Sequence, residues 1–119
     1  MSISYLSMTK QKCKDMGRDF WKTEVWNPFA HVRQDLFGFA DAVCLASQGI
    51  VAIQCTGPSG FNEHKDKILA NDYARKWLRC GGFIELWGWR QLLKKRGGKA
   101  KKWEARIEQI TLESFNKPS

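Results

Sequence analysis

The sequence predicts an α/β sandwich in which helices cover a central mixed β-sheet. Three observations favour this class: two segments carry apolar residues at helical spacing, five runs are β-prone, and these elements follow one another in the order α-β-β-β-α-β-β. The 119 residues suffice for one hydrophobic core. We therefore expect a single domain over 1–119, with its core over about 5–112 and a C-terminal tail over 113–119.

The N-terminal third predicts one helix and one strand. Apolar residues at helical spacing in 4–16, closed by Gly17, predict a short amphipathic helix with Ser4 or Ser7 as its cap. Residues 19–28 are rich in aromatic and β-branched side chains and end at an Asn-Pro pair, which resists continuing a central strand. They predict the first strand, followed by a loop.

That loop, over 29–38, leads into two apolar runs at 39–47 and 50–56, joined by the turn-like pair Gln48-Gly49. Two short β-prone runs with such a connection predict a β-hairpin near the centre of the sheet.

The C-terminal half predicts a second helix and two more strands. Residues 62–79 carry apolar side chains near helical period, with Asn62 or Ser59 as the cap. The runs 83–92 and 103–112 both read as strands, and the segment between them is basic.

The net charge of +8, from 20 Lys and Arg against 12 Asp and Glu, favours a polyanionic partner, of which nucleic acid is the first candidate. The four cysteines form no CxxC pair, so we expect reduced, mostly buried thiols. We find neither a signal peptide nor a run of about 18 apolar residues, which predicts a cytoplasmic protein without a membrane partner. A P-loop and a GxGxxG motif are also absent, so we expect no nucleotide cofactor.

The segment 94–102 predicts a basic hairpin tip that contacts phosphates, because cationic side chains on an exposed loop release counterions when they bind a nucleic acid. The residues expected to bind are Lys94, Lys95, Arg96, Lys99, Lys101 and Lys102. In the strand before this tip, Trp87 and Trp89 share one face and either pack in the core or stack on unpaired bases.

The two central strands carry polar residues that need partners. If 50–56 is a strand, Gln54 and Thr56 lie on one face, and an unsatisfied buried amide costs about 1–3 kcal/mol. Asp41 stands near the start of the preceding strand, so a hairpin brings it beside Gln54. A carboxylate and an amide oxygen begin a site for Mg²⁺ or Mn²⁺.

Asp41 followed by Gln54-Cys55-Thr56, on adjacent strands with helices before and after, resembles the PD-(D/E)xK nuclease superfamily and its restriction-endonuclease-like fold. Segments 33–41 and 49–56 are also similar to small phage and bacterial proteins of this fold, and the resemblance covers roughly residues 5–90. It implies a Holliday-junction-resolvase-like or Mrr-like endonuclease that needs Mg²⁺ or Mn²⁺. Its expected substrate is branched DNA, DNA ends or single-stranded regions, cut by a homodimer in the cytoplasm of a bacterium or a phage-infected host.

Carried over by position, Asp41 matches the family's first metal-binding Asp, and Gln54 stands at the (D/E) position. Thr56 stands at the Lys position, where a hydroxyl cannot supply the positive charge that stabilises a phosphorane. Lys67, on the following helix, is the expected substitute, with a solvated helix face as the alternative.

Further residues complete the predicted site. Asp35 is expected as a second metal carboxylate, with a positioning residue or a turn residue as the alternatives. Glu24 is expected as the assisting upstream acid, with Asp15 and Asp19 as competing candidates and an exposed strand residue as the alternative for Glu24. Arg33, Lys65 and His64 are expected to contact DNA near the site. Two other classes stay open: an inactive nuclease-fold module that binds nucleic acid, and a small regulatory protein-interaction factor.

Overall fold

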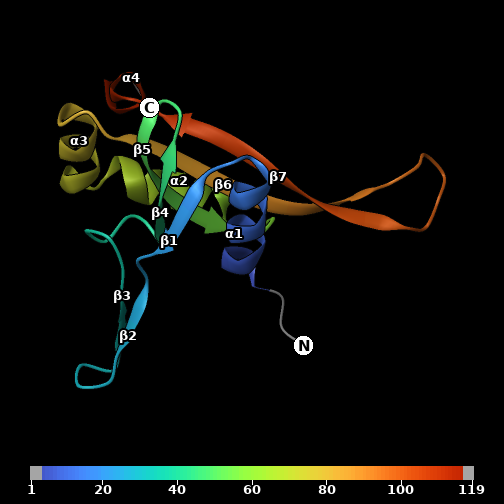
Figure 1. The fold of residues 1–119 in the computed structure, drawn as a ribbon, viewed down its shortest axis with the longest axis horizontal. Coiled ribbons are helices and arrows are strands. Elements are labelled where there is room, and N and C mark those ends of the chain that lie inside the picture. Colours follow the sequence, from blue (N-terminus) through green and yellow to red (C-terminus); the bar gives the residue numbers. More distant parts are fainter. Residues whose placement is uncertain (1–3, 117–119) are drawn as a thin grey trace.

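The chain folds around a five-stranded mixed sheet, as described for residues 4–116 by a computed structural model. In chain order the elements are α1 (Tyr5–Asp15), β1 (Asp19–Lys22), β2 (Val25–Asn27), β3 (Val32–Gln34), β4 (Ala42–Ala46), β5 (Gly49–Thr56), α2 (Phe61–Leu69), α3 (Asp72–Arg79), β6 (Phe83–Leu93), β7 (Lys101–Ile110) and α4 (Leu112–Asn116). The strand order in the sheet is β1-β4-β5-β6-β7 (Figure 1). Only β5 and β6 run parallel, and the other neighbours are antiparallel.

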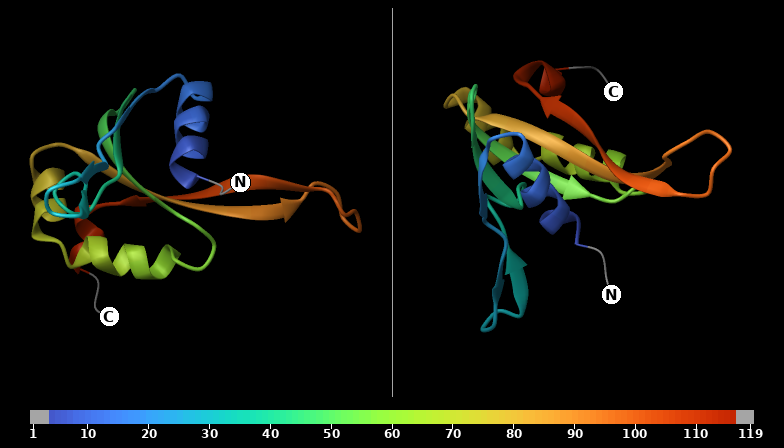
Figure 2. Two further views of the ribbon diagram at one scale, coloured as in Figure 1. Left: turned by 90° about the horizontal axis from the view of Figure 1, so that it is seen from below. Right: turned by 45° about the vertical axis from the view of Figure 1, so that its right-hand side comes forward.

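Helices cover both faces of this sheet, which confirms the predicted α/β sandwich with a central mixed sheet. Figure 2 shows α1 on one side and α2 on the other. The α1 face buries a cluster made of Cys13, Cys44, Val51, Ile53, Trp87 and Trp89. The opposite face buries Phe39, Ala40, Ala52, Phe61, Ile68, Ala74, Ile84, Leu86 and Ile110. The two clusters are the two halves of the hydrophobic core, divided by the sheet.

Helix α1 confirms the predicted N-terminal helix and identifies its cap. The Ser4 side chain accepts a hydrogen bond from the backbone N–H of Ser7 at 3.1 Å, so Ser4 is the N-cap. Thr9 is buried in the helix and accepts a hydrogen bond from Trp89 Nε1 at 2.8 Å, which fastens α1 to β6.

The prediction of one strand over 19–28 is wrong, as is the prediction of a loop over 29–38. β1 pairs with β4 in the main sheet, whereas β2 pairs only with β3 in a separate two-stranded sheet. The chain turns away between them because the backbone N–H groups of Thr23 and Glu24 both donate to the Asp41 carbonyl, at 2.9 and 3.0 Å. The hairpin of residues 23–34, which we call the finger, projects from the core (Figure 1).

The segment 62–79 forms two helices rather than the predicted one. The interruption lies at Asn71, whose side-chain oxygen accepts hydrogen bonds from the N–H groups of Tyr73 and Ala74 and so begins α3. Gly60, rather than Asn62 or Ser59, is the N-cap of α2, and it makes no side-chain cap bond. Apolar spacing continues through the break, which is why the sequence does not reveal it.

The β6-β7 hairpin is longer than its two predicted strands. Its outer half, residues 90–106, extends well beyond the sheet and is called the arm, with 94–100 at the tip (Figures 1 and 2). At the sheet end of the hairpin, Trp87 and Trp89 are buried with ring centroids 6.0 Å apart. They belong to the core, so the alternative in which they stack on unpaired bases is wrong.

The C-terminal segment differs in part from the predicted tail. Residues 112–116 form the short helix α4, and Phe115 packs against the core cluster of the α2 face. The rest of the predicted tail, 117–119, lies outside the described residues. Across 4–116, helices with the length and apolar composition needed to cross a bilayer are absent.

Candidate active site

Asp41 is held at the start of β4 by hydrogen bonds on both sides of the residue. Its N–H donates to the Ile53 carbonyl at 2.8 Å, and its carbonyl accepts from the first two residues of the finger. Its carboxylate accepts a hydrogen bond from the backbone N–H of Cys55 at 3.3 Å and lies 3.6 Å from the Cys55 sulfur. The backbone of Asp41 lies beside the Ile53–Gln54 segment of β5, as the predicted hairpin requires, but its carboxylate is fixed on Cys55 rather than on Gln54.

The surroundings of Asp41 oppose its negative charge. Burial raises the pKa of its carboxyl group to about 6, and the charges of Glu24 and Asp35 add to this effect. Over residues 4–116, Asp41 takes part in no salt bridge with Lys, Arg or His. A bound cation would favour the ionised carboxylate.

Cys55 supports Asp41 as a neutral donor. Burial, followed by the charge of Asp41, raises the pKa of the Cys55 thiol to about 12. The protonated thiol therefore faces the carboxylate at neutral pH. The sequence analysis did not identify this residue, because its side chain follows the alternation of β5 onto the α1 face, where a cysteine is an ordinary core residue.

Glu24 and Asp35 lie at the base of the finger and approach Asp41 from outside the main sheet. Glu24 pairs with Arg33 at 2.6 Å, and this hydrogen bond raises the pKa of the Arg33 guanidinium. Burial is the largest cause of the raised pKa of Asp35, and the charge of Glu24 adds to it. Glu24 of the finger and Asp35 just after it thus lie near Asp41, and Arg33 of the finger pairs with Glu24.

Four of the predicted site residues line one cavity of about 200 Å³ on the α2 side of the sheet. The lining residues are Asp35, Gly38, Phe39, Gln54, His64, Lys67 and Ile68. They come from the finger-to-β4 loop, β5 and α2, so the fold assembles the cavity from separate segments. Asp41 is not in this lining; it stands at the adjoining strand end, with its carboxylate against Cys55.

Two polar side chains of α2, His64 and Lys67, differ in the partners they contact. His64 Nδ1 lies 2.8 Å from the Gly60 carbonyl oxygen, which can only accept, so Nδ1 carries the proton and neutral His64 offers Nε2 as an acceptor. The Lys67 ammonium group pairs with Glu63 at 3.4 Å in an exposed i,i+4 contact. Such an exposed pair contributes little free energy, so Lys67 can exchange Glu63 for a phosphate.

Thr56 and Gln54 share one face of β5, as predicted, but they serve different purposes. Thr56 is buried against the start of α2, where a Cβ added at Gly60 would lie 2.5 Å from Thr56 Oγ1. Only glycine fits there without displacing Thr56. The threonine therefore fixes the entrance to α2, and it supplies no positive charge at the position of the motif lysine.

Other predicted residues lie away from the cavity. Lys65 pairs with Glu108 of β7 at 2.7 Å and is oriented toward the edge of the sheet. The basic residues of the arm tip lie at the far end of the β6-β7 hairpin, apart from Asp41 (Figure 1). Any DNA contacted by both regions must span the molecule.

A buried acid, Glu85 of β6, contrasts with the half-buried Asp41. Its two carboxylate oxygens accept from the Arg18 guanidinium at 2.8 and 3.2 Å, and one also accepts from Trp87 Nε1 at 3.0 Å. The hydrogen bonds that Arg18 donates to Glu85 raise the pKa of the Arg18 guanidinium. Glu85 is thus a fully paired structural acid.

The donor chemistry around Asp41 fits a hard divalent cation. Within 4–116, no three or more His, Cys, Asp or Glu side chains gather as a metal-binding group. Mg²⁺ needs fewer protein ligands than that, because it commonly keeps one or two carboxylates and fills its other positions with water and substrate phosphate. Asp35 and the Gln54 amide supply oxygen donors of this kind in the cavity, whereas the Asp41 carboxylate is held against Cys55 at the adjoining strand end.

Comparison with known proteins gives no family or relative: no protein-family model, curated protein or solved structure matches this chain.

Proposed function

We propose that the protein is a divalent-metal-dependent DNA endonuclease of the PD-(D/E)xK type that acts on branched or structured DNA. The observation that carries the proposal is the cavity shared by Asp35, Gln54, His64 and Lys67, with Asp41 at the adjoining strand end. These residues come from three separate segments of the chain, and the sequence predicts Asp35, Gln54 and Lys67 for phosphodiester hydrolysis and His64 for contact with DNA.

The order of the core elements supports the restriction-endonuclease-like assignment. Without the finger and α4, the chain runs α1, β1, β4, β5, α2 with α3, β6 and β7, which agrees with the expected α-β-β-β-α-β-β order apart from the divided helix. Asp41 precedes the second strand of the main sheet and Gln54 lies on the third, as the family pattern requires.

The distribution of charge supports DNA as the substrate. Residues 90–106 contain eight Lys and Arg and one acid, a net charge of +7, whereas the other 102 residues carry twelve basic and eleven acidic side chains, a net charge of +1. Nearly all of the excess positive charge therefore lies on the arm. A projecting element of this charge suits a phosphate backbone.

Each group of the site then has a distinct role. Asp35 and the Gln54 oxygen would hold Mg²⁺ or Mn²⁺ in the cavity, and Asp41 would join them by exchanging its hydrogen bonds from Cys55 for the metal. The metal, when bound, would supply Lewis-acid stabilisation of the phosphate and a more acidic water. Lys67 exchanges Glu63 for a phosphate oxygen, and His64 Nε2 accepts a hydrogen bond from water in the cavity. The arm holds the DNA backbone, so recognition depends on DNA shape more than on sequence, and cutting both strands requires a homodimer.

A second candidate is a nucleic-acid-binding protein of the same fold without catalysis. Two observations favour it: Thr56 leaves the motif position without an ammonium group, and the Asp41 carboxylate already receives hydrogen bonds from Cys55. Both candidates share the arm as the DNA-binding element, so they differ only in hydrolysis.

The test incubates the protein with linear duplex, single-stranded and four-way-junction DNA, with and without Mn²⁺. Asp41→Asn is the test variant because it keeps the acceptor for Cys55, and Asp19→Asn, an exposed aspartate at the far end of β1, is the matched control. We expect Mn²⁺-dependent cleavage by the wild type and the control, and none by Asp41→Asn. Equal cleavage by Asp41→Asn would contradict the site, and binding without cleavage by all three would favour the second candidate.

A further inference from the structure

The finger exposes large apolar side chains instead of burying them. Phe29 at its tip is 96% exposed, Trp26 is 57% exposed, and Val25 and Val32 are about half exposed. These residues follow one another on a two-stranded ribbon that pairs with no other strand. Exposed apolar residues gathered on one small element mark a binding surface.

The tip of the finger is held in a defined shape. The Asn27 side-chain oxygen accepts hydrogen bonds from the N–H groups of Phe29 and Ala30, at 3.0 and 3.1 Å, which closes the turn. Trp26 packs edge-on against His31, with ring centroids 6.3 Å apart. Phe29 is thus presented to solvent by an ordered turn.

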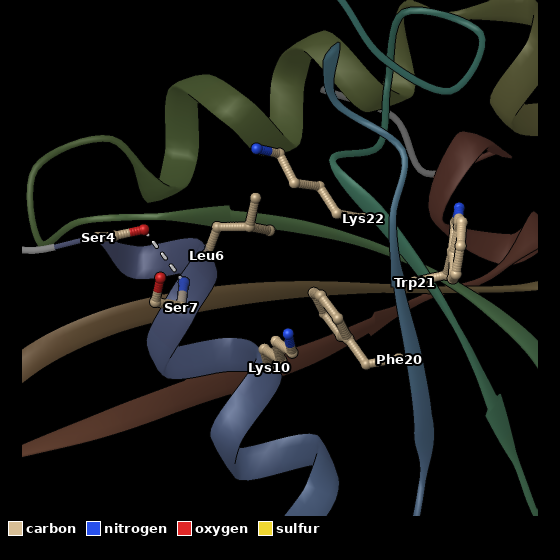
Figure 3. Close-up of a pocket in the computed structure, with 7 residues that line it drawn as sticks. All are labelled: Ser4, Leu6, Ser7, Lys10, Phe20, Trp21 and Lys22. Atoms are coloured by element: carbon tan, nitrogen blue, oxygen red, sulfur yellow. Dashed lines mark hydrogen bonds between the residues drawn. The ribbon is translucent and has the colours of Figure 1, made fainter.

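A basic groove adjoins the base of the finger, between α1 and β1. It has a volume of about 450 Å³, and Lys10 and Lys22 bring ammonium groups to it beside the apolar side chains of Leu6 and Phe20. Figure 3 shows Phe20 and Lys22 pointing toward α1, with Trp21 on the other side of β1. The combination of apolar surface and cationic groups suits the backbone and bases of an unpaired strand.

We propose that the finger is a wedge whose Trp26 and Phe29 rings stack on unpaired bases at a DNA branch, while the groove holds the displaced strand. This inference rests on the proposed function. The finger bears one Glu and one Arg, which pair with each other, so it presents no unpaired carboxylate to a phosphate backbone. Aromatic rings accept any base on their faces, and apolar wedges open base steps.

The location of the finger favours DNA over other occupants. Its base supplies Glu24 and leads to Asp35 of the cavity, so a base stacked on the finger leaves the adjoining backbone near the candidate site. The finger and the arm leave the core in different directions, with α1 between them (Figures 1 and 2). The duplex part of a branched substrate can therefore contact the arm while its junction contacts the finger.

The test measures binding in EDTA, so that hydrolysis cannot intervene, to a duplex and to a flapped duplex with 2-aminopurine at the branch. The test variant combines Trp26→Ala with Phe29→Ala. The matched control combines Leu45→Ala with Ile50→Ala, two half-exposed apolar residues at the β4-β5 turn. Thermal unfolding verifies that each variant is folded, and sedimentation gives its oligomeric state.

We expect the finger variant to lose about tenfold in affinity for the flapped DNA and less than about twofold for the duplex. It also loses the 2-aminopurine fluorescence change, and the control variant retains both properties. The wedge is contradicted if the finger variant keeps its branch preference, if it weakens duplex binding equally, or if it changes only self-association. A wild type that binds DNA without help from the finger overturns this inference alone, whereas a wild type that binds no DNA overturns the proposed function as well.

Discussion

Glu85 and Asp41 are both carboxylates withdrawn from water on the same sheet, but the protein treats their charges in opposite ways. Glu85 receives two hydrogen bonds from Arg18 and a third from Trp87. Within residues 4–116 the Asp41 carboxylate receives hydrogen bonds only from Cys55, the charges of Glu24 and Asp35 oppose its own, and Arg33, which attracts it, is paired with Glu24. Glu85 is paired within the fold, whereas Asp41 forms no salt bridge in this part of the chain.

This difference separates a structural acid from a functional one. A buried charge is costly unless it is paired, so folding alone favours the arrangement of Glu85. An acid whose pKa is raised by burial and by neighbouring acids stores unfavourable energy that a cationic ligand relieves. We infer that Asp41 is retained for binding, at some expense of stability.

The largest expected effect comes from breaking the complete pair. Arg18→Met leaves Glu85 buried without its cation and should lower the free energy of unfolding by about 3–5 kcal/mol. Chemical denaturation measures this loss. Arg33→Met, which breaks the exposed pair with Glu24, is the control and should leave the free energy of unfolding nearly unchanged. Equal, small losses in both variants would remove the distinction.

Asp41→Asn should have the opposite effect and raise the free energy of unfolding. Because the pKa of Asp41 is raised to about 6 by the fold, the folded protein binds a proton that the unfolded chain releases, and stability falls as the pH rises from about 4 to above 6. The variant lacks this cost, so it should be about 3 kcal/mol more stable than the wild type at neutral pH and equal to it at acid pH. Urea unfolding across pH measures both. A variant less stable at neutral pH would show that the fold needs the charge.

The Lys and Arg side chains of the arm are expected to bind DNA without contributing to the stability of the fold. Lys95→Gln with Arg96→Gln should weaken DNA binding about tenfold and reduce the salt slope by about 2, with no change in the unfolding midpoint. Lys76→Gln with Arg79→Gln, which removes the same charge from α3, should leave both quantities unchanged. Salt titrations of affinity check this. A loss that is equal in both variants would mean that net charge, rather than the arm, binds DNA.

The smallest expected effect concerns the neighbours of Asp41. Glu24→Gln removes one like charge, so the pKa of Asp41 should move down toward its ordinary value, and the loss of stability with rising pH should shrink. Comparing the pH dependence of unfolding in the variant and the wild type measures this change. An unaltered pH dependence would show that burial alone sets the pKa of Asp41.

The sequence predicts the parts of the fold whose side chains alternate between core and solvent. The β4-β5 hairpin and α1 carry clear apolar patterns, and both form as expected. The sequence does not reveal the finger, because β2 and β3 have three residues each and no buried face that would give a repeating pattern of apolar residues. Such a hairpin depends on its turn and on bonds to Asp41, which the pattern of apolar residues does not encode.

The candidate site was predicted residue by residue but not in its arrangement. The alternation of β5 correctly puts Gln54 and Thr56 on one face. The alternation of β5 does not reveal that the Asp41 carboxylate bonds to Cys55 rather than facing the cavity. Asp41 lies just before β4, whose first residue, Ala42, pairs with Ile53, so the apolar pattern of the strands does not set the direction of its side chain. The grouping of Glu24 and Asp35 near Asp41 likewise depends on the finger.

We infer that Asp41 binds a divalent cation and that this binding stabilises the folded protein. Thermal unfolding of the wild type and Asp41→Asn, with and without Mn²⁺ at about a hundred times its dissociation constant, tests this directly. We predict that Mn²⁺ stabilises the wild type by about 2.7 kcal/mol. We predict that it leaves Asp41→Asn unchanged. Equal stabilisation of both proteins, or of neither, would contradict the account.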